Sequence, residues 1–255
     1  MVTKISLKVW IVFLCCLWSF HVYSQEKSTI TFGTGFGVPL YTWKSSEDLS
    51  TLRSINRGMW GINAYAQKEI KNNWVFEWNF TVHRFSSYLQ IVDLNRGSKA
   101  STGYKYVFDQ YQLNNLALKK FKIPNTKIAF LIGAGIGLNL LPHNSISMPE
   151  NGFHFLRTKD NSGNSVPVYD ISLIDSEVTI NNKYSVNLIS KLGLNYKISE
   201  VSSLVLFSHH GYNLAGPIME KNLREIMYEN QNFGAVHKLS PWFSFISLGY
   251  EITLK

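Results

Sequence analysis

The feature of this sequence that most constrains its fold is a strict alternation of apolar and polar residues. Segment 74–85 shows it most clearly, with Trp74, Phe76, Trp78, Phe80 and Val82 separated by mostly polar neighbours. The same period recurs in eight segments: 28–38, 57–70, 74–85, 104–121, 127–140, 183–197, 202–213 and 241–255. Because successive side chains of a β-strand point to opposite faces, the pattern predicts eight strands, each with one apolar face.

The connections between these segments alternate in length. The short ones are 71–73, 122–126 and 198–201, and the long ones are 39–56, 86–103, 141–182 and 214–240. Outer-membrane barrels have this alternation, with short periplasmic turns, long external loops and both termini in the periplasm. We therefore expect an all-β fold, an eight-stranded antiparallel transmembrane β-barrel.

The polar face of the segments is typical of a narrow barrel interior and not of a water-facing surface. Charged residues make up only 16% of the chain, against roughly 25% in a typical soluble domain, which disfavours a disordered chain or a nucleic-acid binder. The residues that we predict to face the lumen are Gly33, Gly35, Glu77, Asn79, His83, Gly133, Gly135, Gly137, Lys191 and Glu251. Side chains fill an eight-stranded barrel, so no open pore is expected.

Aromatic residues stand near both ends of the apolar face. Trp60, Tyr184 and Trp242 lie at loop ends of their segments, and Trp74 and Tyr196 lie at turn ends. Their spacing matches the roughly 25 Å apolar band of an outer-membrane barrel, so we predict two interfacial girdles in contact with outer-membrane lipid. A soluble periplasmic β-sandwich, with the same aromatics in its core, is the alternative fold.

The first 24 residues are predicted to be a cleaved signal peptide. Residues 1–24 combine two lysines, an apolar run and a small residue, Ser24, at the expected cleavage position. Residues 25–255 then form one barrel domain. Both cysteines, Cys15 and Cys16, precede that site, so we expect no disulfide, thiolate metal site or cysteine nucleophile in the mature chain.

Two places interrupt the alternation. Between Tyr111 and Leu118 the apolar positions shift by one residue, which predicts either a bulge near Asn114 or a change in the face that carries the apolar residues. In the loop 141–182, the apolar pieces 168–174 and 177–180 predict a short external hairpin.

One cluster carries residues suited to nucleophilic chemistry. Ser208, His209 and His210 follow Leu204 and Leu206 in segment 202–213, and the pattern leaves open which face carries them. The cluster resembles the His-x-Ser-Asn of outer-membrane lipid A deacylases, in which histidine activates serine towards a lipid ester. Tyr212 stands where the resemblance would place the serine. A lipid hydrolase that uses Ser208, His209 and His210 is therefore the alternative function.

No other motif predicts a cofactor or metal site. The histidines lack zinc-site spacing, the acidic residues of 141–182 lack the order of a calcium loop, and the glycine runs do not open a helix as phosphate-binding loops do. Lysines gather at the short turns, where they predict a periplasmic rim that meets anionic lipid headgroups and no nucleic acid.

The mature chain resembles the small outer-membrane barrels grouped as PorT-like. The resemblance rests on the signal that ends before Gln25, the glycine-alternating runs 32–37 and 133–137, and the final segment 247–255. It implies an outer-membrane location, insertion by the barrel-assembly machinery and an accessory role with envelope or secretion partners. We accordingly expect a structural, recognition or secretion-accessory protein that acts through its external loops and is not an enzyme.

Overall fold

The structure is a computed structural model that describes residues 29–45, 52–92, 99–101, 106–142, 146–147, 152–159, 162, 165–228 and 231–254. The predicted signal peptide lies outside this range. Within the described residues, no helix combines the length and apolar character needed to cross a membrane.

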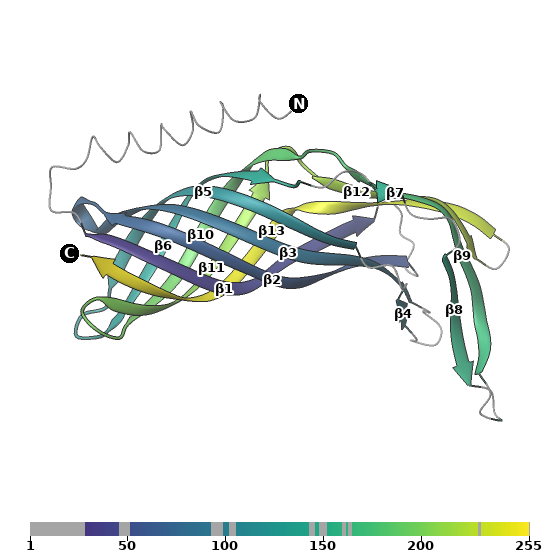
Figure 1. The fold of residues 1–255 in the computed structure, drawn as a ribbon, viewed down its shortest axis with the longest axis horizontal. Coiled ribbons are helices and arrows are strands. Elements are labelled where there is room, and N and C mark those ends of the chain that lie inside the picture. Colours follow the sequence, from purple (N-terminus) through teal and green to yellow (C-terminus); the bar gives the residue numbers. More distant parts are fainter. Residues whose placement is uncertain are drawn as a thin grey trace.

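Eight strands form a closed antiparallel barrel (Figure 1). They are β1 (Ile30–Ser45), β2 (Leu52–Glu69), β3 (Trp74–Val92), β5 (Tyr106–Lys122), β6 (Ile128–Leu140), β10 (Tyr184–Lys197), β11 (Ser202–Asn213) and β13 (Gln231–Leu254). They pair in that order, and β13 pairs back with β1 from Ile30 opposite Leu254 onwards. Each predicted segment overlaps one of these strands, so the predicted fold class is confirmed.

Short turns join the strands at one end of the barrel. The β2–β3 turn is the 3₁₀ segment η1 (Lys71–Asn73), in which Asn72 and Asn73 have φ values of 62° and 59°. Asn125 adopts φ 59° in the β5–β6 turn. Asparagine tolerates this left-handed conformation better than most residues, because its short polar side chain can hydrogen-bond locally. We call this end of the barrel the turn end.

At the opposite end the strands continue beyond the predicted segments. The additional strands are β4 (Lys99–Ser101), β7 (Ile146–Ser147), β8 (Gly152–Lys159), β9 (Ser165–Ile180) and β12 (Met219–Tyr228). Strand β12 pairs with the first part of β13 and with β9, and β9 pairs with β7 and β8. We call β7, β8, β9, β12 and residues 231–239 of β13 the sheet extension (Figure 1). Much of what the sequence suggested to be loop is therefore strand.

The predicted hairpin of 168–174 and 177–180 is wrong. Both pieces belong to one strand, β9, which pairs with β12 from Ile171 to Ile180. The register between β9 and β12 shifts where Asp175 and Ser176 lie, so this polar pair accompanies a bulge instead of a turn. The hairpin in this region is formed by β8 and β9.

Of the two interpretations of the shift near Asn114, the bulge is wrong and the change of face is correct. Strand β5 keeps a continuous register with β3 and with β6. Leu113 points outward, whereas Leu116 and Leu118 are fully buried in the interior. The apolar residues change face because the interior near the turn end is closed by an apolar cluster, which also contains Val75 and Leu131.

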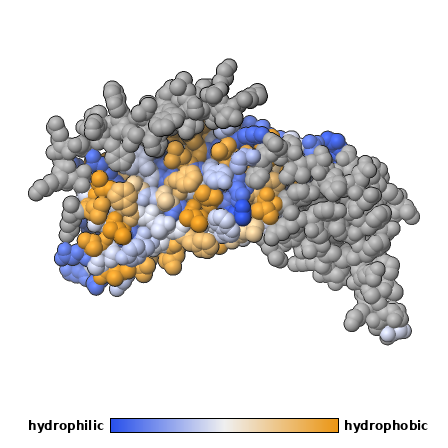
Figure 2. Space-filling view, in the orientation of Figure 1, coloured by the Kyte–Doolittle hydropathy of each residue, from blue (hydrophilic) through white to orange (hydrophobic). Residues whose placement is uncertain are grey.

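The outer face of the barrel is apolar and exposed. Many leucine, isoleucine, phenylalanine and valine side chains there are more than a third exposed, and Leu248 of β13 reaches 61%. Figure 2 shows these apolar residues as patches along the visible side of the barrel. The opposite face of the same strands points into the closed barrel and buries polar groups. This arrangement excludes the sandwich alternative, because the apolar faces do not pack against one another.

Candidate functional site

A buried ion pair crosses the centre of the barrel. The ammonium group of Lys191 on β10 lies 2.6 and 2.8 Å from the two carboxylate oxygens of Glu77 on β3, and these strands are not neighbours. Gln67 and Asn79 donate further hydrogen bonds to Glu77, at 2.7 and 3.1 Å. Both charges are thus compensated, as buried charges must be to be tolerated.

Polar and aromatic groups continue from this pair towards the turn end. The Lys191 ammonium lies 4.6 Å from the ring centroid of Tyr65 and 4.3 Å from that of Phe207. Tyr65 donates a 2.9 Å hydrogen bond to Glu251, and Asn195 donates another. Cation–π contacts and hydrogen bonds therefore link the central pair to the second buried carboxylate.

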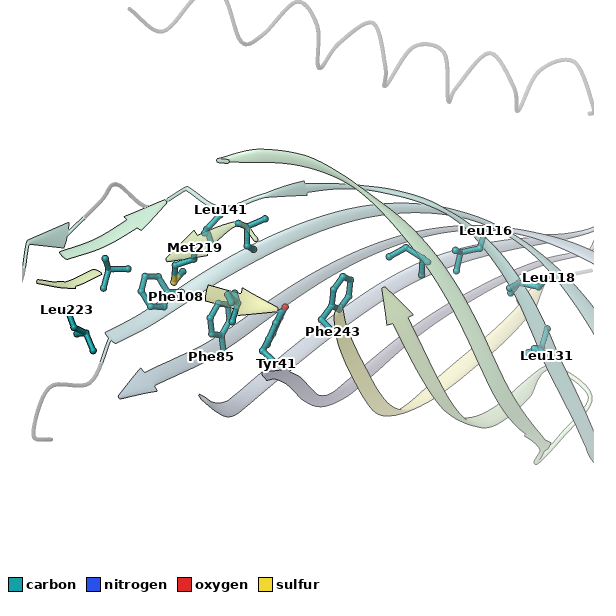
Figure 3. Close-up of a cluster of buried hydrophobic side chains, with 14 of the residues drawn as sticks. Tyr41, Phe85, Phe108, Leu116, Leu118, Leu131, Leu141, Met219, Leu223 and Phe243 are labelled. Carbon is teal, nitrogen blue, oxygen red and sulfur yellow. The ribbon is translucent and has the colours of Figure 1, made fainter. Parts of the chain in front are cut away.

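On the side of the ion pair that faces away from the turn end, an aromatic stack fills the interior. Tyr41 hydrogen-bonds with His83 at 2.8 Å and donates to Gln110, so His83 Nδ1–H is the donor to Tyr41. The Tyr41 ring lies 4.5 Å from Phe85 and 5.9 Å from Phe243. In Figure 3 these rings gather with Phe108, Leu141, Met219 and Leu223, and Leu116, Leu118 and Leu131 of the same apolar cluster lie further along the barrel. Apolar side chains thus lie on both sides of the polar centre.

The side chains predicted to face the lumen lie inside the barrel. Glu77, Asn79, His83, Lys191 and Glu251 are all buried. The glycines face inward too, and a Cβ at Gly33 would lie 2.2 Å from the Tyr65 ring. The small residues Gly35 and Gly137 likewise adjoin Asn63 and Asn114, while Gly133 and Gly135 lie against the backbone of β5. These glycines make room for large interior side chains.

The predicted girdle residues lie on the outer face. Trp74, Tyr184, Tyr196 and Trp242 are between 47% and 62% exposed. Trp60 is half-buried beneath the Arg84 guanidinium, 5.2 Å from its ring centroid.

The structure separates the three members of the Ser208–His210 cluster. His209 is buried in the interior, stacked 6.2 Å from Phe245. Ser208 and His210 lie on the outer face, continuing the row of Leu204 and Leu206. The sequence left open which face of segment 202–213 carries these residues, and the structure places Ser208 and His210 outside and His209 inside. His209 therefore cannot act together with its two neighbours.

On the outer face, Ser208 and His210 form a hydrogen-bonded chain with a residue of another strand. Ser208 Oγ lies 2.9 Å from His210 Nε2, and His210 Nδ1 lies 2.9 Å from Ser244 Oγ of β13. Ser190 of β10 and Ser244 lie directly opposite His210 on its two sides. We call Ser190, Ser208, His210 and Ser244 the polar row.

Sequence reasoning missed Ser190 and Ser244, although a signal was present. Ser190 interrupts the apolar set between Leu188 and Leu192, and Ser244 does the same between Trp242 and Ile246. One or two polar interruptions on each of three strands are unremarkable in sequence. Only the register shows that the interruptions lie side by side.

A second buried lysine lies in the sheet extension. Lys221 of β12 is fully buried opposite His237 of β13, and its ammonium lies 4.7 Å from the ring centroid of Trp43. Among the described residues this ammonium has no hydrogen-bond partner. Burial lowers the pKa of Lys221 to about 7, and burial together with the Lys221 charge lowers the pKa of His237 to about 4.

No metal centre is formed by the described residues, because no three His, Cys, Asp or Glu side chains come together. In the acidic connection, Glu177 forms an ion pair with Arg224 at 2.7 Å. Asp160 and the side chains of Asp170 and Asp175 lie outside the described part of the chain.

Comparison with solved structures finds bacterial proteins that resemble this chain at low sequence identity. OprG from Pseudomonas aeruginosa is 11% identical with a TM-score of 0.45, covering 88% of this chain and 95% of its own. Neisserial surface protein A is 14% identical (TM-score 0.42, coverage 89% and 99%), and Ail of Yersinia pestis is 11% identical (TM-score 0.39, coverage 90% and 100%). The described strands form a closed, eight-stranded antiparallel β-barrel. No family model and no curated protein sequence matches this chain.

Proposed function

We propose that this protein resides in a bacterial outer membrane and acts through its sheet extension in recognition, or as an accessory of envelope or secretion machinery. The observation that carries the location is the exposed apolar outer face bounded by aromatic side chains. On β10, Tyr184 and Tyr196 are separated by 12 positions of strand. At ~3.3 Å per residue and a tilt near 40°, this is a band of about 30 Å, close to the expected thickness.

The filled interior supports a role other than diffusion through a pore. The ion pair of Lys191 and Glu77 crosses the centre, and the aromatic stack around Tyr41 and Phe85 lies between it and the sheet extension. An eight-stranded barrel has room for little more than its own side chains. The surface left for specific contacts outside the membrane is then the sheet extension and the connections that join its strands.

The PorT-like resemblance of the glycine-alternating and final strands supports the accessory role. In this proposal the barrel-assembly machinery inserts the chain after removal of residues 1–24. Lysines at the turn end, such as Lys119, Lys127 and Lys197, face the periplasm and meet anionic headgroups there. Envelope or secretion partners then bind at the sheet extension.

Labelling of single cysteines in whole cells tests this orientation. Residues 25–255 contain no cysteine, so Lys238→Cys in the sheet extension and Lys127→Cys at the turn end each introduce one thiol. We expect a membrane-impermeant maleimide to label Lys238→Cys in intact cells and Lys127→Cys only after lysis. The reverse pattern, or recovery of the protein in the aqueous fraction after osmotic shock, contradicts the proposal. Retained heat-modifiable migration in gels is the folding control.

A further inference from the structure

Polar side chains on the lipid side of a barrel need an explanation, because hydrocarbon offers them no hydrogen bonds. The polar row places Ser190, His210 and Ser244 on three consecutive strands at one level of the outer face. An ionisable residue in such a position marks a functional site more often than not. The contacts within the row show what that site can do.

The depth of His210 and Ser244 matches the ester region of an outer-leaflet lipid. Tyr212 and Trp242 lie directly opposite each other with ring centroids 4.7 Å apart, and aromatic pairs of this kind lie at the headgroup level. His210 and Ser244 are each two residues closer to the barrel centre. At ~3.3 Å per residue with a 40° tilt, they lie about 5 Å below the aromatic pair.

Ser208 lies deeper still, between two apolar side chains. It is directly opposite Leu192 of β10 and Ile246 of β13, both about half exposed on the outer face. An acyl chain that packs on Leu192 and Ile246 therefore passes the Ser208 hydroxyl, which lies 2.9 Å from His210 Nε2.

We propose that Ser208, His210 and Ser244 form a lipid-facing site that hydrolyses an acyl ester of an outer-leaflet lipid. Ser208 is the nucleophile and His210 the general base, and Ser244 is a positioning residue that accepts the Nδ1–H of His210. This tautomer leaves Nε2 free to accept the Ser208 proton across the 2.9 Å contact. The proposal rests on the membrane location proposed above.

The reaction runs in two balanced halves. Ser208 Oγ attacks the ester carbonyl while its proton passes to His210 Nε2. The ester C–O bond then breaks, and the departing lipid alcohol takes that proton, which leaves an acyl group on Ser208. Water attacks the acyl group, its proton passes through His210 to Ser208 Oγ, and a fatty acid is released.

Turnover is expected to be slow. Backbone N–H groups of β11 are used in pairing with β10 and β13, so the backbone offers no oxyanion hole of the kind that accelerates serine hydrolases. A covalent probe of the Ser208 nucleophile is therefore a more sensitive measurement than the release of fatty acid.

The test uses the full-length mature protein in detergent micelles and a fluorophosphonate, with mass spectrometry to locate the adduct. We expect the wild type to be labelled on Ser208. Ser208→Ala and His210→Gln should abolish labelling, and Ser244→Ala should slow it about tenfold. Ser244→Thr keeps the hydroxyl and should restore the rate. Ser247→Ala, on β13 but facing inward, is the matched control and should label like the wild type.

A second measurement follows fatty-acid release from phosphatidylethanolamine vesicles with a labelled acyl chain. We expect release by the wild type and a loss of about 100-fold in Ser208→Ala. An unlabelled wild type, a label on any other serine, or equal release by both proteins overturns the hydrolytic site. Heat-modifiable migration shows that each variant is folded. Cysteine labelling in cells distinguishes a failure of the hydrolytic site from a failure of the proposed membrane location. If Lys238→Cys still reacts from outside, the location is supported even when hydrolysis is absent.

Discussion

Two buried lysines of this protein have opposite surroundings. Lys191, in the barrel centre, contacts both carboxylate oxygens of Glu77 and lies over two aromatic rings. Lys221, in the sheet extension, contacts the Trp43 ring and has no hydrogen-bond partner among the described residues. The comparison teaches that burial alone does not define the energetic role of a charge. A matched partner makes the charge part of the scaffold, whereas a missing partner makes it a source of instability.

Breaking the paired lysine should have the largest effect. Lys191→Met leaves the Glu77 carboxylate buried without its cation, which should lower the free energy of unfolding by about 3–5 kcal/mol. Urea unfolding in micelles, followed by tryptophan fluorescence, measures the loss. The double variant Lys191→Met/Glu77→Gln should recover most of it, and Lys127→Met, an exposed turn lysine, should change little. A single variant as stable as the wild type would show that the ion pair contributes nothing to the barrel.

Replacing Lys221 should raise the free energy of unfolding, by less than the replacement of Lys191 lowers it. Because the folded-state pKa of Lys221 is lowered to about 7, below its unfolded value, the unfolded state holds more protons above pH 7. Stability should therefore rise from pH 7 towards pH 10 in the wild type. Lys221→Met should be more stable at pH 7 and should lack this contribution. Urea unfolding at pH 7 and pH 9.5 checks both statements.

His237, with a pKa near 4, stays neutral throughout this range. Equal pH dependence in the two proteins would contradict the prediction.

The smallest effect is expected for an ion pair at the edge of the barrel. Arg84 contacts Asp109 at 2.6 and 2.8 Å, but their side chains are 38% and 22% exposed. Solvent screens such pairs, so Arg84→Gln should change the free energy of unfolding much less than Lys191→Met does. The same urea titration measures it. A loss comparable with that of Lys191→Met would mean that exposure does not distinguish the two pairs.

The barrel was predictable because lipid and a narrow interior impose a period of two on every spanning strand. The eight segments and the inward positions of Glu77 and Lys191 follow from that period. The bulge predicted near Asn114 failed because Leu116 and Leu118 close the interior, and apolar residues suit both lipid and an apolar core. The sheet extension was missed because strands outside the membrane no longer need one fully apolar face.

The candidate site was only partly predictable, because a local sequence pattern does not show which residues of neighbouring strands lie side by side. Ser208 and His210 are visible as a local cluster, but alternation places His209 on the opposite face of β11. Ser190 and Ser244 come from strands far apart in sequence, and their alignment with His210 depends on register.

The sequence by itself determined the number of barrel strands, their alternating connections and the two faces of most of them, because these are local consequences of chain geometry. Tertiary structure alone decided that Lys191 meets Glu77 and that Ser244 meets His210. Contacts of this kind depend on barrel closure and strand register, which bring together residues that no local pattern connects.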